Sequence, residues 1–316
     1  MNIERILLAT DFSALASGAE AYAAMLAESW RAALTVVNVL EFAPGLNPDY
    51  PVNRLYLDEL RKQAMQAMAD LEARTAAQGL SIRTRVVAGV PSKEVLALAE
   101  ADDVDLIIIG TAGKTGLEHV LLGSTAERVI RMSPCPVLAV RAEPPGGESA
   151  AQRIRQGAIG NVLIPVDFSD CSLDALEYGV VAARQAKASV TLLHVLEPVS
   201  YGLDFTLTLP SSRQHQREAV EERLAGVVGA LDALNVKGEY VVRGGLPNDS
   251  ILEVARTRQA DMIVMGTHGR RGLSHVLYGS VAESVLRKSR CPVLTVRSPK
   301  FRPGHRRIVV VPPASP

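Results

Sequence analysis

The chain has no excess of charge of either sign and no long apolar run. Lys plus Arg and Asp plus Glu number 34 each in 316 residues, so we expect no general affinity for nucleic acid or for an anionic membrane surface. No apolar run reaches the roughly 18–20 residues that a membrane span needs. The first residues lead directly into a strand pattern and lack the layout of a signal peptide. These absences predict a cytoplasmic, globular protein.

Cysteine is scarce as well. The three cysteines include no CxxC pair, which argues against a disulfide framework and against a zinc ribbon. Cys135 and Cys291 each stand just before Pro-Val-Leu and are expected to pack as small apolar residues. Cys171 has no such counterpart, and we expect it to be more exposed.

The most informative feature that is present is an internal repeat. Asp11 and Asp167, like Cys135 and Cys291, are separated by 156 positions. When residues 107–141 are aligned with residues 263–297, 22 of the 35 positions are identical. A repeat of this length indicates a duplicated domain. The turn-rich segment 143–149 marks the joint. We therefore expect domains over 1–145 and 155–298, followed by a basic C-terminal tail over 299–316.

Each half reads as short apolar strands that alternate with helices. In the first half the strands are expected at 6–9, 34–39, 82–87, 106–109 and 136–140, and the second half repeats them. Ser13 and Ser169 are expected to cap the helices that follow the first strands, and Pro91 and Pro247 suit the first turn of later helices. This alternation predicts an α/β fold with a parallel sheet covered on both faces, in which ligands sit at the carboxyl ends of the strands.

A glycine-rich loop follows the fourth strand of each half. The pattern G-x2-G-x9-G-S occurs as Gly110, Gly113, Gly123 and Ser124, and again as Gly266, Gly269, Gly279 and Ser280. Glycines let backbone N–H groups approach a phosphate, the helix N-terminus adds donors, and a hydroxyl residue at the helix start both caps the helix and donates to an anion. The alternative is a turn that needs glycine for steric reasons alone. The identical spacing of the two copies favours phosphate binding.

Two better-known phosphate motifs do not fit. A dinucleotide-binding GxGxxG would follow the first strand, but Thr10-Asp-Phe-Ser13 stands there. The Walker A pattern fails because the glycine it requires five residues before Gly113 is Ile108. A classical dinucleotide fold and a P-loop NTPase are therefore both disfavoured.

With these residues assembled, the chain resembles the tandem-domain members of the universal stress protein family. The glycine pattern, the Asp-Phe-Ser after the first strand and the ending Cys-Pro-Val-Leu-x-Val-Arg carry the resemblance, over about residues 2–141 and 158–297. It implies two Rossmann-like domains of the adenine nucleotide alpha hydrolase type, each with a five-stranded parallel sheet. It also implies ATP as the ligand, with Mg²⁺ accompanying it, and pairing of the two domains through their last strands.

Carried over by position, the resemblance assigns a role to each motif. It places Asp11 and Asp167 near the nucleoside, Val39 and Val195 near the adenine, and the loop glycines with Ser124 and Ser280 at the phosphates. Thr125 adds a hydroxyl in the first copy, where the second has Val281. In the second copy Arg270 and Arg271 replace Lys114 and Thr115, which adds charge near the distal phosphates unless the arginines only form a solvated surface.

Three functions remain open at this point. The first is a stress-response module that binds adenine nucleotide at two unequal sites, and the second is a slow ATPase that uses the same loops. The third is a scaffold with no nucleotide. Phosphoryl transfer needs a positioned base or water and an added cation, and no base stands beside the phosphate loops, which favours binding over turnover. Association of two chains is a further expectation. The tail is expected to be disordered or to add an edge strand through Ile308-Val-Val-Val311.

Overall fold

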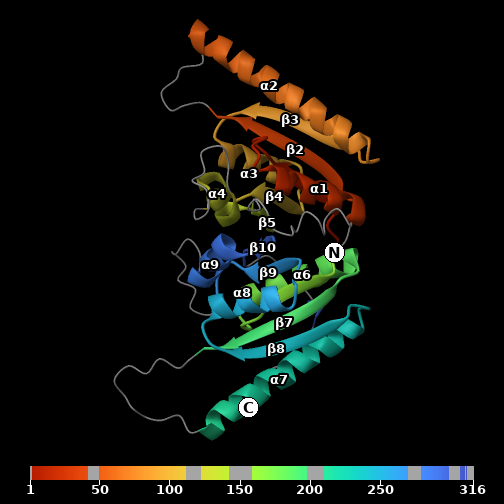
Figure 1. The fold of residues 1–316 in the computed structure, drawn as a ribbon, viewed down its shortest axis with the longest axis vertical. Coiled ribbons are helices and arrows are strands. Elements are labelled where there is room, and N and C mark those ends of the chain that lie inside the picture. Colours follow the sequence, from red (N-terminus) through yellow and green to blue (C-terminus); the bar gives the residue numbers. More distant parts are fainter. Residues whose placement is uncertain are drawn as a thin grey trace, which may run out of the picture. The chain divides into compact units, whose positions relative to one another are not determined.

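The computed structural model describes residues 2–41, 50–111, 122–141, 159–197, 210–269, 279–298, 307–309 and 311. The chain forms two compact units, Met1–Gly157 and Ala158–Pro316 (Figure 1). Within the described ranges, no helix is both long enough and apolar enough to cross a lipid bilayer.

The first unit is a five-stranded parallel sheet, counted over its described residues, with strand order β3-β2-β1-β4-β5. Its elements are β1 (Arg5–Ala9), α1 (Ser17–Trp30), β2 (Ala33–Leu40), α2 (Pro51–Ala76), β3 (Ile82–Ala88), α3 (Pro91–Ala101), β4 (Leu106–Gly110), α4 (Ser124–Met132) and β5 (Val137–Val140). The predicted alternation of strands and helices is confirmed, and the parallel pairing follows because a helix returns the chain after each strand.

The second unit repeats this plan in its own described residues, with strand order β10-β9-β6-β7-β8 and parallel pairing throughout. Its elements are β6 (Asn161–Pro165), α6 (Asp170–Ala186), β7 (Ser189–Leu196), α7 (Pro210–Asp232), β8 (Gly238–Gly244), α8 (Pro247–Thr257), β9 (Met262–Gly266), α9 (Ser280–Lys288) and β10 (Val293–Val296). The duplicated fold that the repeat predicts is therefore present in each half.

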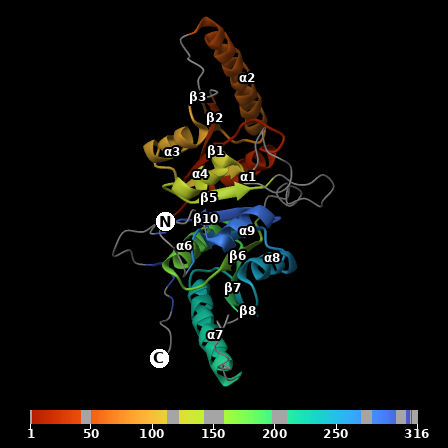
Figure 2. The ribbon, with the colours of Figure 1, turned by 90° about the vertical axis from the view of Figure 1, so that its left-hand side faces the viewer.

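Helices cover both faces of each sheet. Figure 2 shows α1 and α3 on opposite faces of the first sheet, and α6 and α8 on opposite faces of the second. The central strands β4 and β9 are accordingly apolar along most of their length, and Ile107, Ile108, Met262 and Ile263 are fully buried. Burial on both faces explains why these strands show continuous apolar runs rather than alternation.

An aspartate before β4 or β9 fixes the amino end of each sheet. Asp105 Oδ2 accepts hydrogen bonds from the N–H groups of Glu4 and Arg5 at 3.0 and 2.9 Å. Asp261 Oδ2 accepts in the same way from Gly160 and Asn161, at 2.9 and 3.0 Å. These bonds tie neighbouring strands together where they start. The opposite, carboxyl ends are left for the glycine loops and the aspartate turns.

The helix starts match the predictions in three cases out of four. Pro91 and Pro247 open α3 and α8, and Ser169 caps α6 by accepting the N–H of Ser172 at 3.3 Å. The prediction is wrong for Ser13. Its Oγ accepts the N–H of Ala16 at 3.2 Å, but within a turn that precedes α1, so the helix begins only at Ser17.

Candidate functional site

The first strand and the fourth strand of each half are neighbours, as the site hypothesis requires. Ala9 pairs with Ile109, so Asp11 lies two residues past the end of β1 and Gly110 is the last residue of the adjacent strand β4. In the second half Leu163 pairs with Ile263, which brings Asp167 and Gly266 to the same edge of their sheet. The two motifs that the sequence singles out therefore converge at the carboxyl edge in both halves.

The second half shows how closely the loop and the aspartate approach each other. A Cβ added to Gly269 would lie 2.9 Å from Oδ2 of Asp167, so a larger residue would require the carboxylate to shift. Gly113, the corresponding glycine of the first half, lies outside the described residues. In the second half the glycine pattern and the aspartate thus form one site.

Gly266 is required for a different reason. A Cβ at this position would meet Cys171 Sγ at 2.7 Å and the Cys171 carbonyl oxygen at 2.9 Å. Cys171 is 6% exposed, and its thiol donates to the Val296 carbonyl at 3.4 Å. The prediction that Cys171 is the more exposed cysteine is therefore wrong, because the first turn of α6 presses it against the end of β9. The steric explanation of the glycine pattern holds at this position.

The third glycine of each loop starts a helix. Gly123 and Gly279 are the N-cap residues of α4 and α9, and their N–H groups donate to the Thr111 and Thr267 carbonyls at 2.8 and 2.9 Å. An added Cβ would lie 3.3 Å from Thr111 O or 3.4 Å from Thr267 O. Each N-cap glycine is therefore hydrogen-bonded to the residue just past the end of β4 or β9, which brings the amino end of the helix to the carboxyl edge of the sheet.

The hydroxyl residues after these glycines do not cap the helices. Neither helix has a side-chain cap hydrogen bond, and Ser124 and Ser280 are the first helical residues. The predicted capping role of the two serines is wrong, because the glycine before each of them occupies the N-cap position. Both serines are exposed, and Thr125 is half-buried. The first-turn N–H groups lack helical partners, as in any helix, and such groups are suited to donate to an anion.

Each aspartate is held by a tight turn. Asp11 Oδ1 accepts the N–H of Ser13 at 3.0 Å, and Asp167 Oδ1 accepts both the N–H and the hydroxyl of Ser169, at 3.0 and 2.6 Å. The phenylalanine inside each turn has a positive φ, 57° at Phe12 and 64° at Phe168. Such a conformation is uncommon for a bulky residue. The carboxylate orientation is thus fixed by the backbone in both halves.

The two valines assigned to the adenine lie near the ends of the second strands. Val39 is the penultimate residue of β2 and pairs with Val87, and Val195 is the penultimate residue of β7 and pairs with Arg243. Both are half-buried. Since β2 neighbours β1 and β7 neighbours β6, each valine lies on the strand beside its aspartate.

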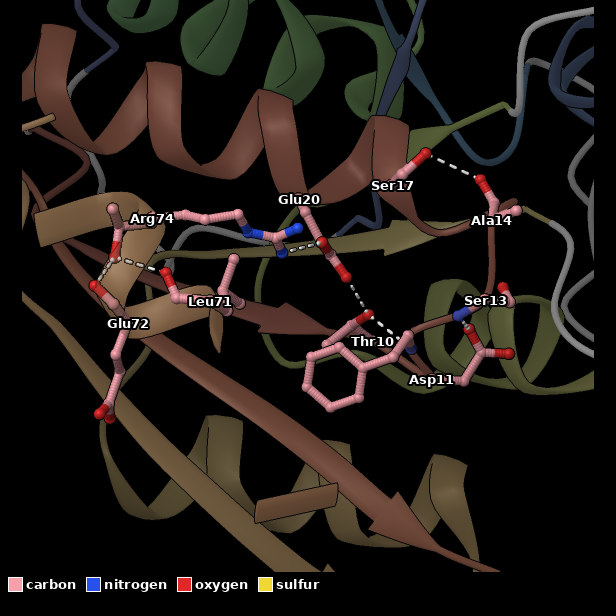
Figure 3. Close-up of polar contacts among 11 residues, drawn as sticks. Thr10, Asp11, Ser13, Ala14, Ser17, Glu20, Leu71, Glu72 and Arg74 are labelled. Carbon is pink, nitrogen blue, oxygen red and sulfur yellow. Dashed lines mark hydrogen bonds and ion pairs between the residues drawn. The ribbon is translucent and has the colours of Figure 1, made fainter. Parts of the chain in front are cut away.

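Behind the first aspartate lies a polar network that sequence reasoning missed (Figure 3). The buried Thr10 hydroxyl donates to Glu20 Oε1 at 2.8 Å and accepts the N–H of Phe12 at 3.0 Å. Arg74 lies 3.4 Å from Glu20 Oε2. Asn38 donates to the Thr10 carbonyl at 2.9 Å. The network therefore connects the aspartate turn to α1, α2 and β2.

The second half replaces this network with an aromatic cluster. The counterparts of Thr10, Glu20 and Arg74 are Val166, Leu176 and Ala230. The centroids of the Phe168 and His194 rings lie 5.2 Å apart, and the Arg223 guanidinium lies 3.7 Å from the centroid of the Phe168 ring. Nδ1 of the buried His194 lies 2.7 Å from the Val166 carbonyl oxygen and so carries the proton. Comparison of the two repeats would have revealed this joint replacement.

Several predicted features lie outside the described residues. Besides Gly113, they are Lys114, Thr115, Arg270 and Arg271. Within the described part of the chain, no group of three or more His, Cys, Asp or Glu side chains is arranged to hold a metal ion.

Comparison with known proteins identifies the repeat. The model of the universal stress protein family matches residues 2–141 and 158–297. A universal stress protein of Methanocaldococcus jannaschii is 34% identical over 139 residues, which cover 44% of this chain and 82% of that protein. A universal stress protein of Mycolicibacterium smegmatis is 28% identical over 302 residues, which cover 92% of this chain and 96% of that protein.

A solved structure supports the same assignment at the level of the fold. The crystal structure of a universal stress protein from Archaeoglobus fulgidus has a TM-score of 0.70 and 21% identity, and the match covers 94% of this chain and 99% of that one. A family match to both halves, together with relatives aligned over nearly the whole length, leads to one conclusion. The chain belongs to the universal stress protein family, as a tandem protein with one family domain in each half.

Proposed function

We propose that the protein binds ATP at two sites, one in each half, and acts as a nucleotide-dependent regulatory module in the stress response. The observation that carries the proposal is the meeting of the two motifs at one sheet edge. In the second half Gly269 lies directly against the Asp167 carboxylate, so the loop and the aspartate are parts of a single arrangement. This edge is where ligands bind in open parallel sheets.

The described residues supply complementary chemistry for each part of the nucleotide. A carboxylate held like that of Asp11 or Asp167 accepts hydrogen bonds from ribose hydroxyls. Val39 and Val195 offer apolar contact and strand backbone groups to the adenine. The amino ends of α4 and α9 face the phosphates, since unpaired N–H groups and the helix dipole both favour an anion there. Mg²⁺ would arrive with the phosphates.

The glycines alone do not carry the proposal, because packing explains some of them. Gly266 accommodates Cys171, and Gly123 and Gly279 accommodate the carbonyls of the preceding threonines. What packing does not explain is the shared geometry of Asp11 and Asp167, each oriented by a turn that contains a phenylalanine with positive φ. Such backbone strain persists where a precise side-chain orientation is needed.

Direct measurement of nucleotide tests the proposal. The protein is purified, denatured, and the released nucleotide identified by absorbance and chromatography, and the nucleotide-free protein is then titrated with ATP by calorimetry. We expect a stoichiometry of two per chain for the wild type and one for Gly279→Val, because Gly279 is the N-cap of α9 and a valine side chain there would occupy space beside the proposed phosphate position. Absence of heat at millimolar ATP in a folded protein would leave the scaffold as the remaining function.

Hydrolysis is a separate question with a separate assay. Steady-state phosphate release by the wild type and by Gly279→Val decides whether the second loop supports turnover. Background rates in the wild type exclude the ATPase. A rate that the variant loses would establish it.

We also propose, from the family resemblance, that the last strands Val137–Val140 and Val293–Val296 pair within one molecule. A disulfide engineered between the two strands would form in monomeric protein if they do. Sedimentation equilibrium of the wild type would determine whether two chains associate in addition.

A further inference from the structure

A short piece of the C-terminal tail is docked on helix α6 of the second half. Arg307 donates to Asp174 Oδ1 at 2.9 Å, and the backbone N–H of Ile308 donates to Glu177 Oε1 at 2.7 Å. Val309 is 1% exposed. The described tail residues, 307–309 and 311, form no strand, so the predicted edge strand is not found there. The segment is instead held by side chains of a helix.

The docking position is specific to the second half. Asp174 and Glu177 are 3% and 1% exposed, although carboxylates rarely become this buried unless cations or N–H groups satisfy them. They are three residues apart, so they lie on one face of α6. Their counterparts in the first half are Gly18 and Ala21, which carry no charge. The acidic pair and the basic tail segment therefore match each other, and α1 has no equivalent.

The same helix holds the candidate site of the second half. Ser169 caps α6 and at the same time donates twice to Asp167. Cys171, in the first turn, packs against Gly266 at the start of the glycine loop. Asp174 follows within the next turn. The tail segment thus contacts α6 one turn away from the residues that orient the Asp167 carboxylate and bound the loop.

We propose that residues 307–309 form a strap that stabilises the amino-terminal turns of α6 and thereby raises the nucleotide affinity of the second site alone. The inference rests on the proposed binding of ATP. When the strap is docked, the Asp167 turn is preorganised, and a preorganised site loses less conformational freedom when it binds. When the strap is released, ATP binding at the second site must also reorder the start of α6, and the cost of this ordering lowers the affinity. Linkage requires the reciprocal effect, so ATP at the second site tightens the strap.

The test uses full-length variants that release the strap in two different ways. Arg307→Glu places a negative charge against Asp174, and Val309→Asp places one at the buried apolar contact. Arg307→Lys keeps the cation and is the matched control. Hydrogen exchange of the peptide containing residues 307–311, measured by mass spectrometry without nucleotide, reports whether the strap is docked. Gly279→Val is expected to block the second site, so an ATP titration in that background reports the first site. Gly123→Val is expected to block the first site, so a titration in that background reports the second.

We expect fast exchange of the tail in Arg307→Glu and Val309→Asp and slow exchange in the wild type and in Arg307→Lys. The affinity of the second site should fall about fivefold or more in the two releasing variants, the lower range of allosteric coupling. The first site serves as an internal control and should be unchanged. Saturating ATP should slow exchange of the tail further when only the second site is intact.

The outcomes separate the strap from the proposed function. If the wild type binds two ATP but its tail exchanges fast, or if release leaves the second affinity unchanged, the strap is overturned and ATP binding stands. A fall of both affinities together would also overturn it, since the effect would then be general destabilisation. If the folded wild type takes up no ATP, the proposed function fails and the strap, as a device acting on that site, falls with it.

Discussion

The two halves of this protein share one fold and one motif but surround their aspartates differently. Behind Asp11 lies a polar network of Thr10, Glu20 and Arg74, whereas Phe168, His194 and Arg223 form an aromatic cluster behind Asp167. The glycine pattern and the Asp-Phe-Ser turn are the same in both halves, whereas the contacts that support the aspartates differ as sets. The same backbone geometry of the aspartate turn is therefore compatible with either kind of support.

The helix after the aspartate turn differs as well. In the second half α6 starts at Asp170, directly after the capping Ser169. In the first half a turn intervenes, and α1 starts only at Ser17, the counterpart of Leu173. The Asp167 turn is therefore joined directly to α6, whereas the Asp11 turn is separated from α1. Substitutions in the two turns should for this reason affect the two halves differently.

The largest effect is expected at the contact between Gly266 and α6. Gly266→Ala introduces a Cβ at 2.9 Å from the Cys171 carbonyl oxygen, which is backbone and cannot rotate away. Overpacking of this kind costs typically about 1–3 kcal/mol of unfolding free energy, and we expect a value of about 3 kcal/mol here. Urea unfolding monitored by circular dichroism measures it.

The chain offers two controls for this substitution. Gly229→Ala on α7 has no atom within 4 Å of the new Cβ and should stabilise by about 0.5–1 kcal/mol through helix propensity. Trp30, the single tryptophan, lies in α1 of the first half, so its fluorescence reports that half alone. A Gly266→Ala variant as stable as the wild type would show that α6 moves freely relative to β9.

The second prediction exchanges the polar support of the first half for its apolar counterpart. Glu20→Leu leaves the Thr10 hydroxyl, which is 6% exposed, without its acceptor, and a buried donor without a partner costs about 1–3 kcal/mol. Adding Thr10→Val removes that donor and should recover most of the loss, as in the second half. Recovery should be incomplete because the Phe12 N–H then loses the Thr10 oxygen. Urea unfolding followed by Trp30 fluorescence measures both variants.

A double-mutant cycle provides the control for this exchange. If the effects of Glu20→Leu and Thr10→Val simply add, the two side chains are not coupled, and the replacement of the network as a set is contradicted. Arg74 is 64% exposed in its side chain, so its ion pair with Glu20 should contribute little. Arg74→Ala alone should therefore change stability only slightly.

Sequence patterns predicted the parts of the molecule that depend on neighbouring residues. The apolar runs indicated the strands, and Pro91 and Pro247 indicated helix starts. Because the repeat offset is constant, each prediction for one half also applied to the other. The side-chain partners that were missed are far apart in the chain. Arg74 and Glu20 are 54 positions apart, and Arg307 and Asp174 are 133 apart. No local pattern records such pairs, because either residue alone is typical of a solvated helix or a basic terminus.

The errors at the site have the same origin. Cys171 was expected to be exposed because it lacked a counterpart, but its burial is determined by the contact with Gly266 across the sheet. Serine commonly caps helices, but the glycine before Ser124 and before Ser280 occupies the N-cap position and is hydrogen-bonded to the threonine that follows the strand. Local residue type predicted which motifs lie at this edge, and tertiary contacts determined the position of each side chain.

The third prediction compares the two sites through the residue after the serine. Thr125 is replaced by Val281 in the second copy, which removes one hydroxyl beside the proposed phosphate position. A hydrogen bond to a charged group contributes about 1.5–3 kcal/mol, so Thr125→Val should weaken ATP at the first site about tenfold, and Val281→Thr should strengthen the second. Calorimetric titration with the other site blocked measures each.

Thr125→Ser is the control for this pair, since it keeps the hydroxyl and removes only the methyl group. Its affinity should stay near that of the wild type. If Thr125→Ser weakens ATP binding while Thr125→Val, which keeps the methyl group, does not, then the methyl group and not the hydroxyl contacts the nucleotide, and the inequality of the two sites must come from the loop cations instead.

The smallest effect is expected at the serines of the aspartate turns. Ser169→Ala removes the cap of α6 and a 2.6 Å hydrogen bond to Asp167, whereas Ser13→Ala removes only a 3.2 Å bond to Ala16 in a turn before α1. Loss of an N-cap costs typically about 1 kcal/mol, so unfolding of the second half should become easier by about that amount, and unfolding of the first half by less. Circular dichroism follows the former and Trp30 fluorescence the latter, with Ser169→Thr as the variant that keeps the cap. Equal losses at Ser13 and Ser169 would mean that both turns support their helices alike, and the closer coupling of the second site to its helix would have to be abandoned.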